Sequence, residues 1–342
     1  MSAVATTAAT AAGVVILIGV SYDLFQTVVL PRPAVRKLQI ARLLVRPLWV
    51  VWRWFGLRSS RLDRSEARLA AFGPLVLLVL FGIWGVGLVL GYGLIIHGMR
   101  DQFRPELQDF PTALYVSAST LVPLAYGDFV PERGGARVLI VIESANGVVL
   151  AALAITVLFE LYGAFRSREE SVVALDALAG ASAVQLLETS AEPDMGAALK
   201  ETFDEWRRWS AMVLESHLAY PLLAFFRSSH DNEAWINSFA AVMDAAALVI
   251  SSVEVESAGA ARLMFTVGDH LVEDMAVVYG LKATPDPIIE RGEYMVAVGR
   301  LRAAGYRVRD GETHWQQFAE MRSKYASMLN QVAQFLATPP AP

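Results

Sequence analysis

The sequence predicts an all-α membrane protein in which a helical domain follows the last span. Of its 342 residues, 55% are hydrophobic and only 18% are charged, which is a low charge content for a soluble chain. Three apolar runs, at residues 12–30, 69–96 and 138–159, approach or exceed the roughly 20 residues that a bilayer-spanning helix needs. From residue 170 onward, apolar residues recur every three or four positions, as they do in packed helices.

The first run predicts an N-terminal transmembrane helix over residues 1–31. No basic residue precedes it and no small-residue cleavage site follows it, so we expect a retained anchor and not a removed signal peptide. Asp23 lies within this run and has no evident partner in the sequence. The chain contains no cysteine, which excludes disulfides and thiolate metal sites.

Residues 32–66 predict a basic, amphipathic segment at the cytoplasmic face of the membrane. Residues 31–68 contain ten Lys and Arg but only Asp63 and Glu66 as acidic residues. Basic residues concentrate in cytoplasmic connections, which places the N-terminus outside and the C-terminal domain in the cytoplasm. Tryptophan and leucine are interleaved with these arginines, so we expect the segment to lie on anionic lipid of the cell membrane. The same composition favours a membrane surface over nucleic acid.

A short half-helix is predicted between the second and third spans. Residues 111–122 are apolar but too short to cross a bilayer, with Pro111 at the first helical position and Asp109 as the cap. The second span ends outside and the third begins outside, so this half-helix enters the membrane from the outer face. Irregular backbone at membrane depth is tolerated only where protein buries it or water wets it. The residues that follow are therefore expected to line an aqueous path.

This order of span, half-helix, loop and span resembles the pore module of the potassium channel family. The resemblance covers roughly residues 67–165. It rests on three stretches, "FPTALYVSAST" (110–120), "AYGD" (125–128) with Pro131, and "GGARVLIVIESANGVVLAALAITVL" (134–158) with the spacing of Arg137, Glu143 and Gly147. It implies a pore module at 67–168, with the pore helix at 111–122, the filter at 123–128 and the inner helix at 135–165. The whole layout resembles bacterial proteins described as potassium channel family members.

In that family, rings of backbone carbonyls from the filter replace the water shell of a potassium ion. The resemblance therefore implies a homotetramer with a monovalent cation, potassium in the family, as the permeant ion. Matching residue by residue places the filter on Pro123, Leu124, Ala125, Tyr126, Gly127 and Asp128. The C-terminal end of each half-helix and a ring of Asp128 side chains would both favour cations over anions.

Two filter positions depart from the family pattern. Pro123 stands where the family has a threonine hydroxyl, and Ala125 stands where the family has a glycine in a backbone turn that other residues resist. A left-handed conformation costs a non-glycine residue about 1–2 kcal/mol, or about 4–8 kcal/mol over four subunits. We therefore expect a cation path with fewer ordered sites and weaker potassium selectivity than the family has.

The third run contributes two further candidate residues. Glu143 is a carboxylate inside a span, which makes it a functional candidate, and we expect it to support the pore by hydrogen-bonding the loop or the half-helix. Gly147 is either a gating hinge or a position where helices approach closely.

Residues 170–342 predict a cytoplasmic domain of about five or six helices. They lack a glycine-rich nucleotide fingerprint, a nucleophile elbow and a phosphate loop, so neither dinucleotide regulation nor an enzyme is expected. The last helix has apolar residues at intervals of three and four over fewer than three heptads, which favours packing on its own domain over a coiled coil.

The sequence is also compatible with two rival functions. A metal or ligand sensor is supported by "GDHLVED" (268–274), in which His270 and either Glu273 or Asp274 lie on one helical face. Further ligands could come from His217, His230 and Asp231, although scattered surface histidines usually bind no metal, and no cofactor is expected. A non-conducting membrane scaffold descended from a channel is supported by Pro123 and Ala125.

Overall fold

The computed structural model describes residues 3–30, 40–58, 62–124, 126–191, 196–228, 234–282, 284, 286 and 288–338. The chain divides into two compact units. Unit 1 comprises Met1–Trp52 and Pro74–Leu161, and unit 2 comprises Arg53–Gly73 and Tyr162–Pro342. The helices α2, α4 and α6 each contribute residues to both units.

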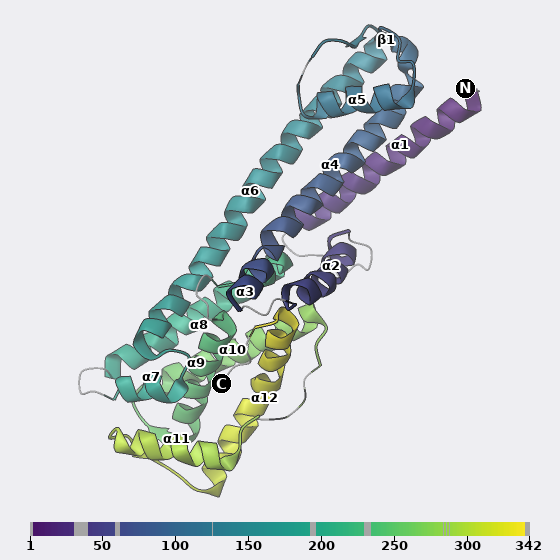
Figure 1. The fold of residues 1–342 in the computed structure, drawn as a ribbon. Helices are drawn as coiled ribbons and strands as arrows, with labels where there is room; N and C mark the ends of the chain where they lie inside the picture. Colours follow the sequence, from purple (N-terminus) through teal and green to yellow (C-terminus); the bar gives the residue numbers. More distant parts are fainter. Residues whose placement is uncertain are drawn as a thin grey trace. The chain divides into compact units, whose positions relative to one another are not determined.

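Unit 1 contains the predicted half-helix, α5, and the apolar helices around it (Figure 1). Its elements are α1 (Ala3–Leu24), the π-helical η1 (Phe25–Val29), most of α2 (Ile40–Gly56), most of α4 (Phe72–Gly98), η2 (Arg100–Gln102), β1 (Phe103–Arg104), α5 (Phe110–Leu121), β2 (Val130–Pro131) and the first part of α6 (Gly134–Ala179). The strands β1 and β2 pair antiparallel, with Phe103 opposite Pro131, and therefore bring together the two ends of the segment that holds α5 and the loop after it.

Helices α1 and α4 lie side by side, and glycines allow their close approach (Figure 1). A Cβ at Gly13 of α1 would lie 2.5 Å from the carbonyl oxygen of Gly91, and a Cβ at Gly87 would lie 2.7 Å from Val20. Small residues at such contacts are the usual way in which helices pack inside a membrane, where lipid competes with any apolar side chain.

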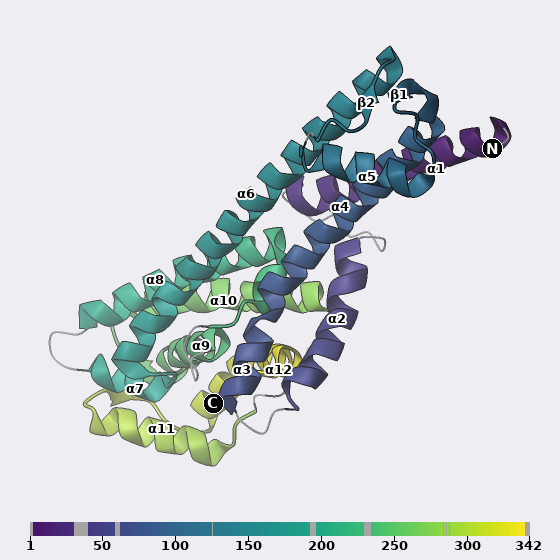
Figure 2. The same cartoon turned by 45° about the horizontal axis from the view of Figure 1, so that its top comes forward.

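The core of unit 1 forms around α5, which lies beside α4 and α6 in both views (Figure 2). One face of α5 is apolar and faces residues of α4 and of the connection that follows α4. The buried cluster comprises Leu88, Tyr92, Ile96, Phe103, Leu107, Ala113, Val116, Leu121 and Ala136. This packing fixes the half-helix from which the candidate filter extends.

Unit 2 is helical, with one largely buried helix, α9, at its centre. Its elements are the end of α2, α3 (Leu62–Ala70), the first two residues of α4, the last part of α6, α7 (Ala183–Thr189), α8 (Gly196–Ala219), η3 (Pro221–Phe225), α9 (Trp235–Ser252), β3 (Val253–Glu254), α10 (Ala258–Tyr279), α11 (Arg291–Ala303), β4 (Arg307–Val308) and α12 (Glu312–Leu336). Helix α9 is covered by α7, α8, α10 and α12 (Figure 2). Helix α12 buries Phe318, Tyr325 and Val332, so it packs on its own unit.

Four of the described helices are long and apolar enough to cross a membrane: Thr6–Val29, Arg64–Gly98, Gly134–Ala179 and Trp235–Ser252. The first three contain the predicted spans. The fourth, α9, was not predicted as a span, and 89% of its most apolar window is buried inside the protein, so it is a core helix. The predicted fold class, a mostly helical membrane protein, is confirmed.

Candidate functional site

The half-helix α5 begins with a strong local cap. Oδ1 of Asp109 accepts hydrogen bonds from the backbone N–H of Thr112 at 2.8 Å and from its hydroxyl at 2.6 Å. These two bonds lower the pKa of Asp109 below its usual value. Pro111 lies in the first turn, where its missing N–H removes no helical bond. The N-terminus of α5 is therefore fixed by residues that are adjacent in sequence.

The predicted filter residues follow the C-terminus of α5. The N–H of Leu124 donates to the carbonyl of Ser119 at 2.8 Å, which turns the chain back over the last helical turn. Pro123, Leu124, Tyr126, Gly127 and Asp128 are exposed in the single chain, and Tyr126 retains 67% of its accessible surface. Ala125, the residue for which a strained turn is predicted, lies outside the described residues. The structure thus brings the five described positions together on one exposed loop.

The backbone conformation at position 127 favours glycine. Its φ is +77°, in the left-handed region that L side chains rarely adopt, and no atom lies within 4 Å of the position a Cβ would take. Any penalty for a larger residue there would therefore come from the backbone and not from a clash.

The outer end of the loop is held by aromatic residues and an acid. The hydroxyl of Tyr115, on α5, is hydrogen-bonded to Asp128. The ring of Tyr115 also lies 6.4 Å from the ring of Phe129, edge to face. Sequence reasoning did not identify Tyr115, because its contact with Asp128 joins two elements that the sequence pattern alone does not place together.

Glu143 is buried between α6, α5 and α4. Its Oε1 lies 2.5 Å from the hydroxyl of Ser117 on α5, and that hydroxyl lies 3.0 Å from the carbonyl of Val89 on α4. Glu143 is 0% exposed, and its Oε2 has no hydrogen-bond partner among the described residues. The Glu143 side chain thus contacts α5 directly and α4 through Ser117.

Gly147 lies where α6 meets the end of α5. A Cβ at this position would lie 1.8 Å from the carbonyl oxygen of Leu121, far closer than any real Cβ contact. The preceding residue, Asn146, donates to the hydroxyl of Tyr92 on α4. Close approach is therefore sufficient to explain the glycine, and the hinge role stays a prediction.

Asp23 has partners that the sequence did not indicate. Its Oδ2 accepts from the indole N–H of Trp84 on α4 at 2.8 Å, and its Oδ1 accepts from the backbone N–H of Ile40 at 2.9 Å. Ile40 is the first residue of α2, where backbone N–H groups lack helical partners. An available signal was Trp84 itself, because an indole N–H within an apolar run needs an acceptor.

Among the candidate sensor residues of unit 2, those that the structure describes do not gather into a metal site. His270 and Asp274 lie 3.6 Å apart and are solvent-exposed, and the described residues contain no group of three or more His, Asp or Glu side chains that could hold a metal ion. His230 and Asp231 lie outside the described residues. His217 is buried, and its Nδ1 donates to the carbonyl of Val213 at 2.8 Å. Burial, together with the charge of Arg168, lowers the pKa of His217 to about 3, so it is neutral at physiological pH.

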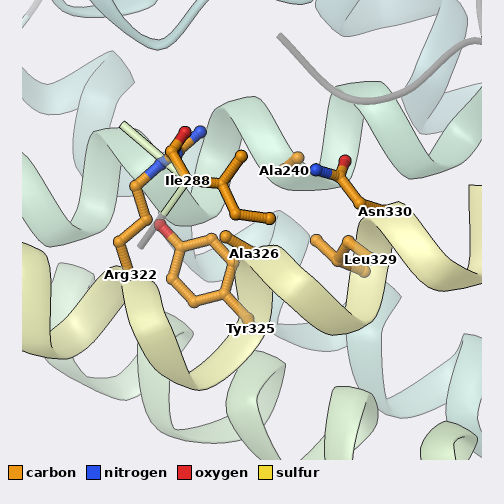
Figure 3. A pocket seen from close by; sticks show the side chains of 7 residues that line it. All are labelled: Ala240, Ile288, Arg322, Tyr325, Ala326, Leu329 and Asn330. Carbon is orange, nitrogen blue, oxygen red and sulfur yellow. The ribbon is translucent and has the colours of Figure 1, made fainter. Parts of the chain in front are cut away.

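A small pocket of unit 2 is lined by residues of α12, by Ala240 of α9 and by Ile288 of the loop before α11 (Figure 3). The guanidinium of Arg322 forms its polar wall, and both ends of this group are taken by the carboxylate of Asp244 at 2.9 and 3.1 Å. Arg322 also donates to the carbonyl of Ile288 at 2.7 Å. An arginine so fully paired offers little to an anionic ligand.

Comparison with known proteins identifies the region built around α5. Residues 75–163 match a family described as "Ion channel". These residues form an ion-channel pore module. The module takes in α5, the candidate filter, Glu143 and Gly147, and the family it belongs to consists of ion channels and not of enzymes, as the sequence predicts.

One relative covers more of the chain. Over 205 residues the chain is 26% identical to a protein of Bacillus subtilis (strain 168) named "Uncharacterized membrane protein YdjJ". The matched part covers 57% of this chain and 58% of that protein. No solved structure matches the chain.

Proposed function

We propose that the protein is a homotetrameric channel that carries monovalent cations passively across the cell membrane. The observation that carries the proposal is the exposed loop at the C-terminus of α5, within a pore module. The backbone of an irregular loop at membrane depth is tolerated only where protein buries it or water wets it. Four copies of the loop around an axis would provide both, because each loop would gain neighbouring protein and face a water-filled path. Ringed carbonyls also require several copies, because each chain supplies one loop.

The electrostatics of this arrangement favour cations. The C-terminal end of α5 carries about half a negative charge, and in a tetramer four such ends would point toward the axis. Asp128 is exposed and would add a ring of carboxylates at the outer mouth. Pro123 has no hydroxyl to offer an ion, so we expect potassium to be preferred only weakly over sodium.

In this proposal the N-terminus lies outside and unit 2 lies in the cytoplasm. Residues 32–66 would then follow the inner leaflet. Helix α2 exposes several large apolar side chains suited to the lipid interface: Leu43, Leu48, Val50, Val51, Trp54 and Phe55. Arg58 stacks over Trp54 at 4.2 Å, as basic and aromatic residues do at headgroup level.

Recording from the purified protein in planar bilayers tests the proposal. With potassium on one side and sodium on the other at equal concentration, we expect a cation current whose reversal potential corresponds to a potassium permeability only modestly above that of sodium. No current under any condition would favour the non-conducting scaffold. A current with full potassium selectivity would keep the channel but contradict the weakened filter inferred from Pro123 and Ala125.

Glu143 is proposed to support the pore as a neutral acid, since an unpaired carboxylate with no exposure would be strongly disfavoured. Glu143→Gln should therefore keep the contact with Ser117 and leave the current close to that of the parent. Glu143→Leu removes the hydrogen bond with Ser117, whose hydroxyl keeps the Val89 carbonyl as a partner, at a cost of about 0.5–1.5 kcal/mol per subunit, and should reduce the current severalfold. Equal currents from both variants in bilayers would contradict this role.

A further inference from the structure

Residues 221–227, "PLLAFFR", form a short segment of unit 2 that we call the anchor segment. It consists of η3 (Pro221–Phe225) followed by Phe226 and Arg227. It contacts the start of α4, the last part of α6 and the end of α12 within the same unit. Because α4 and α6 are the two long helices of the pore module, the contacts of this segment bear on the pore.

The contact with α6 depends on a buried arginine. Arg168 is 0% exposed, and its guanidinium donates to the carbonyls of Phe226 at 2.6 Å and Leu223 at 3.3 Å. The carboxylate of Glu169 lies 2.9 Å from the Arg168 guanidinium and balances its charge. The indole N–H of Trp209, on α8, donates to the backbone carbonyl of Arg168 at 2.9 Å, which ties this turn of α6 to the helical domain.

The contact with the start of α4 is made by aromatic rings. Phe72 and Phe225 lie 5.2 Å apart, edge to face. A Cβ at Gly73 would lie 2.8 Å from the ring of Phe226, so the glycine lets this ring approach the backbone of α4. On the α6 side, Phe226 also contacts Tyr162 at 6.0 Å. One phenylalanine therefore packs against both pore helices at their ends in unit 2.

Arg227 connects this aromatic contact to α3 and α12. It forms an ion pair with Glu66 of α3 at 2.7 Å, and Glu66 precedes the start of α4 by only a few residues. The same guanidinium donates to the carbonyls of Leu336 at 2.7 Å and Ala337 at 3.2 Å, which end α12. Its side chain is only 9% exposed, so this ion pair is screened less than a surface pair.

We propose that the anchor segment is the mechanical link through which the helical domain positions the cytoplasmic ends of α4 and α6 and so acts on the pore. Arg168 and Arg227 are its positioning residues. The inference rests on the proposed channel function. Buried hydrogen bonds and packed rings resist gradual deformation, so a shift of α8 or α12 would be transmitted to both pore helices instead of being absorbed locally.

Two conservative pairs of variants test the link in the full chain. Glu66→Gln and Arg227→Met each remove the ion pair inside the anchor, while Glu312→Gln and Arg291→Met remove an exposed ion pair of 2.9 Å between α11 and α12 as matched controls. We expect the two anchor variants to lower the bilayer current at least about threefold, and the two control variants to leave it unchanged. The double variant of Glu66 and Arg227 should be no worse than Arg227→Met, since both act on one link.

A second measurement does not depend on conduction. Hydrogen exchange of the full chain in lipid nanodiscs should rise in Arg227→Met over α3 and over residues 162–179 of α6, and not only beside residue 227. If the parent carries no current but exchange spreads in this way, the channel function fails and the link stands. If the parent conducts while the anchor variants change neither current nor distant exchange, the link is overturned.

Discussion

Replacing Gly127 by alanine is expected to abolish most of the current while the protein still assembles. Gly127 has φ +77°, and nothing lies within 4 Å of its missing Cβ, so the added methyl meets no neighbour in the single chain. The cost is conformational, about 1–2 kcal/mol for each left-handed residue and about 4–8 kcal/mol for a ring of four. A loss of more than tenfold in bilayer current is therefore expected.

Gly134→Ala is the matched control for this experiment. Gly134 begins α6 in helical conformation, and its added Cβ would also meet no atom within 4 Å. Both variants thus add one methyl in open space, and only one of them forces a left-handed alanine. A Gly127→Ala channel that conducts as well as the Gly134→Ala channel would show that the loop does not need its left-handed turn.

The start of the half-helix could be predicted from the sequence because its determinants are local. Asp109 and Pro111 mark its first turn, and the structure begins α5 at Phe110 with the Asp109 cap in place. The apolar runs likewise predicted three helices of membrane length, because burial in lipid needs nothing but sustained hydrophobicity.

Other features depend on contacts between distant residues and could not be predicted. Asp23 and Trp84 are separated by 61 positions, and no local pattern pairs them. Helix α6 continues past residue 165 to Ala179, because its later turns bury Val172 and Leu175 in unit 2 even though the apolar run has ended. Only the packed domain makes that continuation favourable.

The apolar composition of α9 shows a further limit of sequence patterns. Its 18 residues have a composition typical of a membrane span, yet other helices of unit 2 enclose it. Asp244 within it is paired with Arg322, a contact across 78 positions that gives a largely buried carboxylate its partner. Hydropathy reports that a helix avoids water, and only the structure tells whether lipid or protein replaces the water.

Replacing Gly147 by alanine is expected to have the largest effect in the pore module. The new Cβ would lie 1.8 Å from the carbonyl oxygen of Leu121, which is backbone and cannot rotate away as a side chain could. Either α6 or the end of α5 must move, and the end of α5 leads directly into the candidate filter. We expect a complete loss of current, measured in bilayers, together with loss of the assembled oligomer in detergent.

Gly163→Ala is the control that separates this clash from a general effect of alanine in α6. Gly163 lies in the same helix, and its Cβ would meet nothing within 4 Å. Alanine in a helix interior is favoured over glycine by about 1 kcal/mol, so Gly163→Ala should assemble and conduct like the parent. The Gly147→Ala variant also distinguishes the two explanations of this glycine, a gating hinge and a close contact between helices. A hinge would tolerate alanine with altered gating and intact assembly, whereas a close contact requires both assembly and current to be lost.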